Sequence, residues 1–300
     1  MVDLDVLTAL DALQWLRTAD EVTRRFGISA SSVSRQSRKC LEIFDVQLLR
    51  THGEWNVVGD PSLLLLERRV HQAARWLGRR SLRLEATYWS GPLLCSPPPN
   101  HWILGLSNIV GISRNFQLVR DRIVDACVVG LPDIPDGGDP DLAVKTLSSM
   151  PVFFVACPDH PLVGRSHLSY EDIAEYPTLA LPEGSYPKVE KSLRSIGLWN
   201  DVVRMSRYRR EVWEGRTEAE LTIGYGTVLS REVSGGPSVR LPLELPLASG
   251  EAIVVRKEYL DHLKFTALCD FVLSRLLPFS LRYPEIQLLE SPAGGWGGHA

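Results

Sequence analysis

The sequence is poor in the residues and motifs that usually mark a metal site or a nucleotide site. Five cysteines in 300 residues, with no C-x-x-C pair, predict reduced thiols rather than a disulfide framework or a zinc site. The seven histidines form no pair with ligand spacing, and no G-x-x-x-x-G-K phosphate loop occurs. Gly224-Tyr225-Gly226 lacks the third glycine of a dinucleotide fingerprint. We therefore expect no metal and no cofactor.

A targeting segment and a long hydrophobic run are also missing. Asp3, Asp5 and Asp11 lie where a signal peptide would need a basic start and an apolar core. The longest stretch without a formal charge, residues 86–113, is interrupted by several prolines, whereas a membrane helix needs about 20 mostly apolar residues. We expect neither export nor a membrane span, and the free thiols indicate a cytoplasmic location.

The charge is nearly balanced over the whole chain but not along it. With 33 basic and 36 acidic residues and 44% apolar residues, the composition is that of a globular protein of about two domains. Residues 1–80 hold 12 basic and 10 acidic residues, a net +2, so the remaining 21 and 26 give −5. Residues 22–41 hold five basic side chains and no carboxylate. Such a stretch can bind anionic phosphate, or it can be a solvated helix face.

The first 44 residues carry the pattern of a helix-turn-helix. Leucines recur at every third position from Leu4 to Leu16, which predicts one buried helical stripe. Thr18 to Glu21 has the form of a capping box that starts a second helix, and Gly27 can end that helix in the left-handed conformation. Ser29 can cap a third helix that reaches about Phe44. In a helix-turn-helix, this third helix enters the major groove of DNA.

The third helix has the side chains that a recognition helix needs. Val33 and Leu41 lie on its predicted inner face, and hydroxyls and guanidinium groups lie on its outer face. The alternative is a serine-rich surface helix, but five serines between positions 29 and 37 are unusual unless their hydroxyls have something to bond. The predicted DNA-binding residues, including the positions before and after this helix, are Arg24, Ser31, Ser32, Ser34, Arg35, Arg38, Arg50 and His52.

A hairpin and a long helix follow. Residues 48–58 form two extended runs around Gly53, which predicts a two-stranded wing. Asp60 and Pro61 can start a helix that ends near Gly78. Its apolar residues have the three-four spacing of a coiled-coil seam, which predicts dimerisation, although the same seam could be buried against its own domain. The seam consists of Leu63, Leu66, Val70, Ala73 and Leu77.

These features resemble those of LysR-type transcription regulators. The run from Ile28 to Gln36, followed by Leu41-Glu42 and residues 46–51, matches that family in order and spacing. Residues 125–130 and 152–162 also look like strand and loop landmarks of the family. The family often has glutamine and proline where this chain has Ala30 and Ser31, and a basic wing tip where this chain has Glu54-Trp55. The resemblance implies a homodimer, or a tetramer, that binds an imperfect palindrome in double-stranded DNA.

The rest of the chain predicts an α/β fold. From residue 82 to 280, short β-rich runs alternate with helical patterns, which indicates largely parallel sheets. The resemblance implies an N-terminal winged helix-turn-helix, a linker helix and a periplasmic-binding-protein-like effector domain of two subdomains. The expected ranges are 1–58 for the DNA-binding domain, 59–80 for the linker helix, 81–149 with 235–285 for one subdomain, 150–234 for the other, and 286–300 for a flexible tail.

The cleft between the subdomains is the effector site that the resemblance implies. The glycine and prolines between Leu84 and Ile103 leave little room for the helix that follows the first strand in the family, and the N-terminus of that helix helps to bind an anionic effector. Whether a small-molecule effector binds is therefore left open. The candidate cleft residues are Thr87, Ser90, Ser107, Gly130, Ser185 and Tyr225.

Two other functions compete with the regulator. A solute-binding or effector-binding α/β protein could use its N-terminal helices only to oligomerise. An enzyme would need a titratable constellation in the cleft, and the sequence offers none. The proline between Cys157 and His160 indicates a turn rather than a nucleophilic pair. We expect no catalytic residues.

Overall fold

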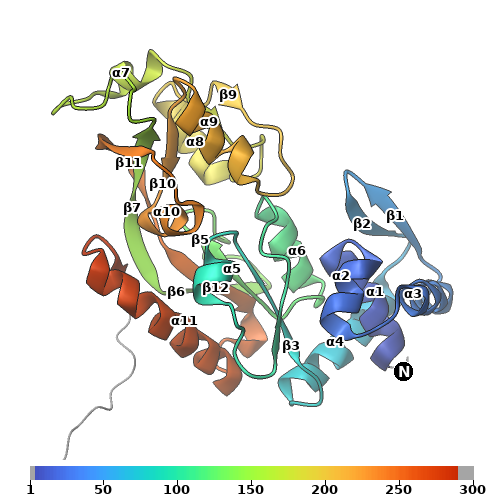
Figure 1. Ribbon diagram of the computed structural model, residues 1–300. Coiled ribbons are helices and arrows are strands. Elements are labelled where there is room, and N and C mark those ends of the chain that lie inside the picture. Colours follow the sequence, from blue (N-terminus) through green and yellow to red (C-terminus); the bar gives the residue numbers. More distant parts are fainter. Residues whose placement is uncertain (1–3, 290–300) are drawn as a thin grey trace, which may run out of the picture.

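The computed structural model describes residues 4–289 (Figure 1). Its N-terminal part is the predicted winged helix-turn-helix, with α1 (Leu4–Leu16), α2 (Ala19–Phe26), α3 (Ala30–Phe44) and a hairpin of β1 (Gln47–Thr51) and β2 (Glu54–Val58). The caps form at the predicted residues, but the capping box predicted at Thr18 is only half formed, because the Glu21 carboxylate pairs with Arg24 and Arg25 instead. The Thr18 hydroxyl accepts from the amide of Glu21, the Ser29 hydroxyl accepts from the amide of Ser32, and Gly27 ends α2 at a φ of 68°.

Two sheets form the effector domain. The first has the strand order β4 (Trp102–Leu104), β3 (Leu82–Ala86), β5 (Ala126–Gly130), β12 (Glu251–Arg256) and β6 (Leu142–Thr146). In the second, β7 (Ser148–Ala156) lies between β10 (Gly224–Gly226) and β11 (Val239–Ser249), and β13 (Gln287–Leu288) also pairs with β7. A separate pair consists of β8 (Leu179–Ala180) and β9 (Asp201–Val202).

The expectation of largely parallel sheets is wrong. Only β3–β4, β3–β5 and β8–β9 are parallel strand pairs within the part of the chain that is described. β7 is antiparallel to all three of its partners, and β12 is antiparallel to both of its neighbours. The reason is that β7 leaves the first subdomain and β11 runs back toward it, so these two crossing strands run in opposite directions.

The chain returns to the first sheet later than predicted. The expected boundary at residue 235 precedes β11, but β11 pairs with β7 and the return occurs at Gly250. A Cβ at this glycine would lie 2.0 Å from the carbonyl oxygen of Ser148, so the two crossings approach too closely for any side chain there. The tail also starts later than predicted, because Gln287 and Leu288 form β13. Residues 290–300 lie outside the described part.

The helices cover both faces of the first sheet (Figure 1). Residues of α6 (Ser113–Arg120) share one apolar core with α1 and α2, whereas residues of α5 (Ser90–Leu94) and α11 (Leu263–Arg282) share another with the opposite face. The helix after the first strand is short, as predicted, because α5 has five residues. Buried residues of α7 (Tyr170–Ala174) and α8 (Pro187–Ser195) share a core with β7 and β11, and α9 (Glu214–Ala219) contacts β7. Buried residues of α10 (Val228–Ser234) lie in the core that contains α5 and α11. The linker helix, α4, spans Ser62–Trp76. No described helix is long and apolar enough to cross a membrane.

Candidate DNA interface and effector cleft

The outer face of α3 is free and basic. The side chains of Ser31, Ser34, Arg35 and Arg38 are exposed, while Val33 is buried in the core below them. Ser32 is half-buried, and its hydroxyl bonds the Ser29 hydroxyl at 2.9 Å. A shallow surface depression is lined by Ser31, Ser34, Arg35, Arg38, Lys39 and Glu42. Figure 1 shows that α3 lies at the end of the molecule remote from α7, α8 and α9, so a duplex can approach it.

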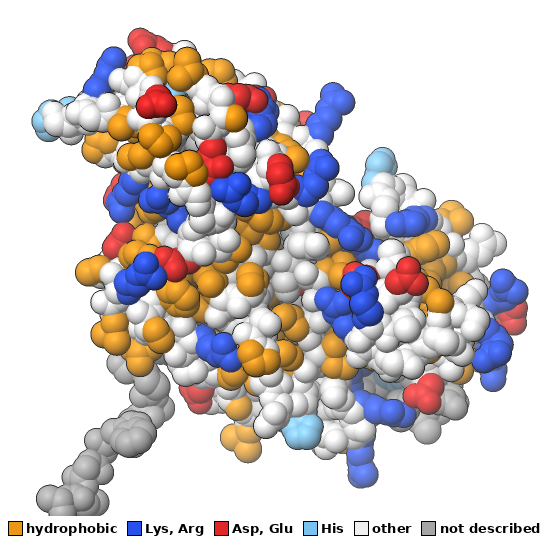
Figure 2. Space-filling view, viewed as in Figure 1, with side chains coloured by type: hydrophobic (Ala, Val, Ile, Leu, Met, Phe, Trp, Pro, Cys, Tyr) orange, Lys and Arg blue, Asp and Glu red, His pale blue; other side chains and the backbone are white. Residues whose placement is uncertain are grey.

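The other predicted DNA-binding residues surround α3. Arg24 is exposed and pairs with Glu21 at 2.5 Å. On the wing, the guanidinium carbon of Arg50 lies 5.4 Å from the centre of the Trp55 ring, and exposed His52 occupies the turn. Figure 2 shows basic side chains around this end of the molecule. All eight candidates thus belong to the N-terminal module, and four of them line the surface depression on α3.

The helix after the wing, α4, exposes a row of apolar side chains, while its buried face mixes Leu64 and Trp76 with charged and polar residues. Leu63, Leu66, Val70 and Leu77 are between 49% and 77% exposed, and Ala73 is half-buried. Residues 4–289 therefore leave the predicted seam uncovered, and the alternative that the seam is buried against its own domain is wrong. The buried residues of this helix include Arg68, Gln72 and Arg75 instead.

Buried carboxylates pair with this polar face. Asp11 of α1 accepts from Arg68 at 2.8 Å and from Arg83 of β3 at 3.3 Å. Asp125 accepts from Arg75 at 2.7 and 3.0 Å, with one bond to each carboxylate oxygen. These pairs connect α4 to the DNA-binding module on one side and to the first sheet on the other.

The DNA-binding module also contacts the first subdomain directly. The indole nitrogen of Trp15 donates to Glu85 at 2.8 Å, and Arg25 donates to the carbonyl oxygens of Leu104 and Gly105 at 2.9 and 3.0 Å. A Cβ at Gly105 would lie 2.2 Å from a Glu85 carboxylate oxygen, so only glycine at this position leaves room for the hydrogen bond between Trp15 and Glu85. No pattern in the sequence predicts this interface, because these partners are 70 to 80 residues apart and no local signal links them.

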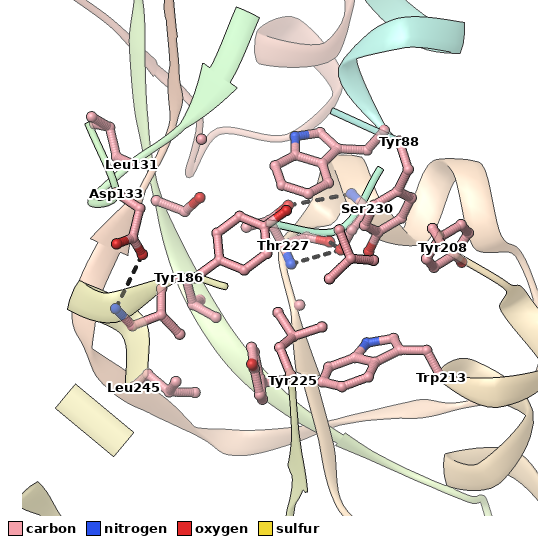
Figure 3. A pocket seen from close by; sticks show the side chains of 18 of the residues that line it. Tyr88, Leu131, Asp133, Tyr186, Tyr208, Trp213, Tyr225, Thr227, Ser230 and Leu245 are labelled. Atoms are coloured by element: carbon pink, nitrogen blue, oxygen red, sulfur yellow. Dashed lines mark hydrogen bonds between the residues drawn. The ribbon is translucent and has the colours of Figure 1, made fainter. Parts of the chain in front are cut away.

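A cavity of about 100 Å³ lies between the two subdomains (Figure 3). It is bounded by the segments that follow β3 and β5, by α8, by β10 with the start of α10, and by β7 and β11. Its walls are mostly aromatic and aliphatic: Tyr88, Trp89, Val110, Leu131, Val152, Leu181, Tyr186, Met205, Tyr208, Trp213, Tyr225, Leu245 and Leu247. The carboxyl ends of the parallel strands β3 and β5 thus meet the cleft, as in other α/β sheets.

Two of the six candidate cleft residues, Gly130 and Tyr225, line this cavity. Ser107 lies behind the wall, where its Cβ would meet a Cβ at Gly91 at 2.3 Å. Ser185 lies against Gly111. Thr87 and Ser90 are buried and belong to a different network, in which their hydroxyls lie 2.6 Å apart.

That network is centred on Glu251, at the start of β12. Its carboxylate accepts from the Ser90 hydroxyl at 2.5 Å and from the Trp89 indole nitrogen at 2.8 Å. Burial raises the pKa of Glu251 to about 7, and these two hydrogen bonds oppose the shift. No sequence pattern marks this group, because a glutamate that opens a strand usually faces solvent.

The remaining chemistry-bearing residues are structural. His160 is buried and its Nδ1 accepts from the amide of Leu162, so it closes the turn predicted around Pro158. All five cysteines are free thiols. Residues 4–289 hold no group of three or more histidine, cysteine, aspartate or glutamate side chains placed to bind a metal ion.

Comparison with known proteins agrees with this architecture. The family model described as the LysR substrate binding domain matches residues 111–277, more than half of the chain. A search of curated proteins found no match.

Several solved structures share the fold over nearly the whole chain. A full-length OxyR variant from Pseudomonas aeruginosa is 16% identical, with a TM-score of 0.58, 91% of this chain covered and 95% of that one. An OxyR mutant from Corynebacterium glutamicum, bound to H2O2, is 15% identical, with a TM-score of 0.52, and the match covers 92% of this chain and 94% of that one. A protein of Pseudomonas aeruginosa described as a probable transcriptional regulator is 14% identical, with a TM-score of 0.55, and the match covers 91% of this chain and 97% of that one.

Proposed function

This chain belongs to the LysR family of transcription regulators, and we propose that it acts as a homodimer that binds an imperfect palindrome in double-stranded DNA. The family is one of regulators and not of enzymes. Two recognition helices related by a two-fold axis would enter successive major grooves about 34 Å apart, which sets the spacing of the half-sites.

The exposed apolar row of α4 is the observation that carries the proposal. A helix that buries arginines and exposes leucines needs another apolar surface to cover the leucines. A second copy of α4 offers the same three-four seam, and two such seams make a self-complementary interface. Two dimers could associate further into a tetramer, as the family does.

We assign the DNA contacts from exposure and chemistry. Ser31, Ser34 and Arg35 on the outer face of α3 would contact base edges, since hydroxyl and guanidinium groups can hydrogen-bond there. The set around them, and at the wing, would contact phosphates and position the module: Arg24, Ser32, Arg38, Arg50 and His52.

Arg35→Ala tests this assignment. It should cost about 1 to 3 kcal/mol at one position of the DNA site and relax specificity there, whereas the exposed Arg165→Ala, in the second subdomain, should change nothing. The measurement is a salt titration of binding to random genomic duplexes and to fragments enriched from them. Equal losses on every sequence would make Arg35 a phosphate contact. Absence of any preferred fragment would favour the solute-binding alternative.

We further propose that a small molecule in the cleft modulates DNA binding. The Glu85 carboxylate accepts from the amide of Ser107 at 2.8 Å and from that of Ala86, next to the cavity-lining segment, and it also holds Trp15 of the DNA-binding module. A ligand that moves this segment would therefore act on α1. The measurement is DNA affinity with and without a cleft ligand in the wild type and in Trp15→Phe. An equal ligand effect in both proteins would refute this route.

A further inference from the structure

The cavity lacks the basic groups that would hold an acidic effector. Among the described residues that line it there is no lysine, arginine or histidine, and Asp133 is the only one with a charged side chain. A carboxylate or phosphate brought into this space would lose its hydration and find no opposite charge. It would also face the carboxylate of Asp133.

The helix starts that border the cavity already have their own acceptors. Asp133 accepts from the amides of Lys188 and Val189, in the first turn of α8, at 2.8 and 3.1 Å (Figure 3). At the start of α10, the Thr227 hydroxyl accepts from the amide of Ser230, and the Ser230 hydroxyl accepts from that of Thr227. Two first-turn amides of α8, and the amides of Thr227 and Ser230 at α10, are therefore already engaged by the chain itself.

Aromatic rings that contact one another form much of the cavity wall. Tyr88 and Tyr208 stack with ring centres 3.6 Å apart and planes 8° apart, and Trp213 meets Tyr225 edge-on at 5.3 Å. The hydroxyl of Tyr208 is engaged, because it donates to Glu214 at 2.6 Å. The hydroxyl of Tyr225 is different. It is shielded from solvent and has no hydrogen-bond partner among residues 4–289.

From these observations we infer that the cleft takes an uncharged, largely apolar ligand no larger than about one aromatic ring, with one polar group that hydrogen-bonds the Tyr225 hydroxyl. The inference rests on the proposed role of the cleft as the effector site. The volume of about 100 Å³ sets the upper limit on size, since an apolar protein cavity of about 150 Å³ binds benzene. A buried hydroxyl without a partner is the group that such a ligand would satisfy.

Phenol, toluene and benzoate separate the parts of this inference, because they share one ring and differ in the polar group and the charge. Titrations at pH 7.5 would follow the fluorescence of Trp89 and Trp213, which line the cavity, together with calorimetry. Phenol should bind at least tenfold more tightly than benzoate. Tyr225→Phe should lower the affinity for phenol to that for toluene and leave the affinity for toluene unchanged. Tyr170→Phe, outside the cavity, should change neither.

Asp133→Ala should increase the affinity for benzoate, a change that a misfolded protein would not show. Removing this carboxylate frees the amides of Lys188 and Val189 and removes a negative charge, so benzoate should bind at least tenfold more tightly than it binds to the wild type. Phenol affinity should change less than threefold. Circular dichroism and the melting temperature would confirm that the variant is folded.

The failures are distinguishable. Benzoate binding to the wild type as tightly as phenol, or no saturable binding of phenol and toluene, overturns the inference. A protein that binds its DNA site but prefers the carboxylate refutes the inference alone. A protein that binds phenol as expected but binds no DNA refutes the proposed regulator and leaves the ligand class standing.

Discussion

Replacing Glu251 by glutamine should change how stability depends on pH. The folded protein raises the pKa of Glu251 from 4.5 to about 7, because the carboxylate is fully buried. Below about pH 4.5 the group is protonated in both states. Between the two pKa values the unfolded chain releases the proton while the folded chain keeps it, so the free energy of unfolding falls as pH rises.

The structure sets the size of this effect. A pKa shift of one unit corresponds to about 1.4 kcal/mol. The rise from 4.5 to about 7 therefore lowers the free energy of unfolding by about 3 kcal/mol once the pH is above 7. About 2 kcal/mol of that loss falls between pH 5.5 and 8. Glutamine is the same size, and it can accept from the Trp89 indole and donate to the Ser90 hydroxyl, so Glu251→Gln keeps the network without the ionisation.

Urea denaturation followed by tryptophan fluorescence would measure the difference between the two proteins at several pH values. Compared with Glu251→Gln, the wild type should lose about 2 kcal/mol between pH 5.5 and 8. Glu183→Gln, at an exposed loop position, controls for the loss of one charge. Parallel pH profiles for the wild type and Glu251→Gln would show that the carboxylate is solvated in solution and would refute the reasoning.

Three further predictions concern other parts of the molecule. Leu66→Glu should convert the proposed dimer to a monomer in sedimentation experiments, because it places a charge on the α4 seam, whereas Leu281→Glu, at an exposed leucine of α11, should not. Asp125→Ala should lower the free energy of unfolding by about 3 to 5 kcal/mol, since it leaves a buried guanidinium unpaired; a loss below about 1 kcal/mol would contradict the buried pair. Gly105→Ala should cost about 1 to 3 kcal/mol, because its Cβ would lie 2.2 Å from a carboxylate oxygen, and Gly137→Ala, whose Cβ would meet nothing, should cost less than about 1 kcal/mol.

The local features of the N-terminal module followed from the sequence. The caps at Thr18 and Ser29 and the left-handed Gly27 depend on neighbours within four residues, so the residue pattern was enough to predict them. The shortness of α5 was predictable for the same reason, because prolines restrict the backbone wherever they occur.

The sequence predicted the exposed apolar face of α4 but not its buried face. Three-four spacing marked the exposed apolar seam, but the same spacing could not tell which face the rest of the chain would cover. That choice depends on Asp11 and Asp125, which lie 57 and 50 residues away from Arg68 and Arg75 in sequence. The strand directions failed for a related reason, since alternation of strands and helices does not reveal where the chain crosses between subdomains.

The cleft shows the same division most clearly. Gly130 and Tyr225 were found because each lies at or next to a strand end, but the hydroxyls of Thr87 and Ser90 turn away toward Glu251, which is 161 residues from Ser90. The helix-turn-helix, the wing, the apolar seam and the family could be read from the residue pattern, because these features depend on short-range order. The burial of particular groups, the carboxylate at the start of α8 and the apolar character of the cavity emerged only from the folded chain, because those properties arise when distant segments meet.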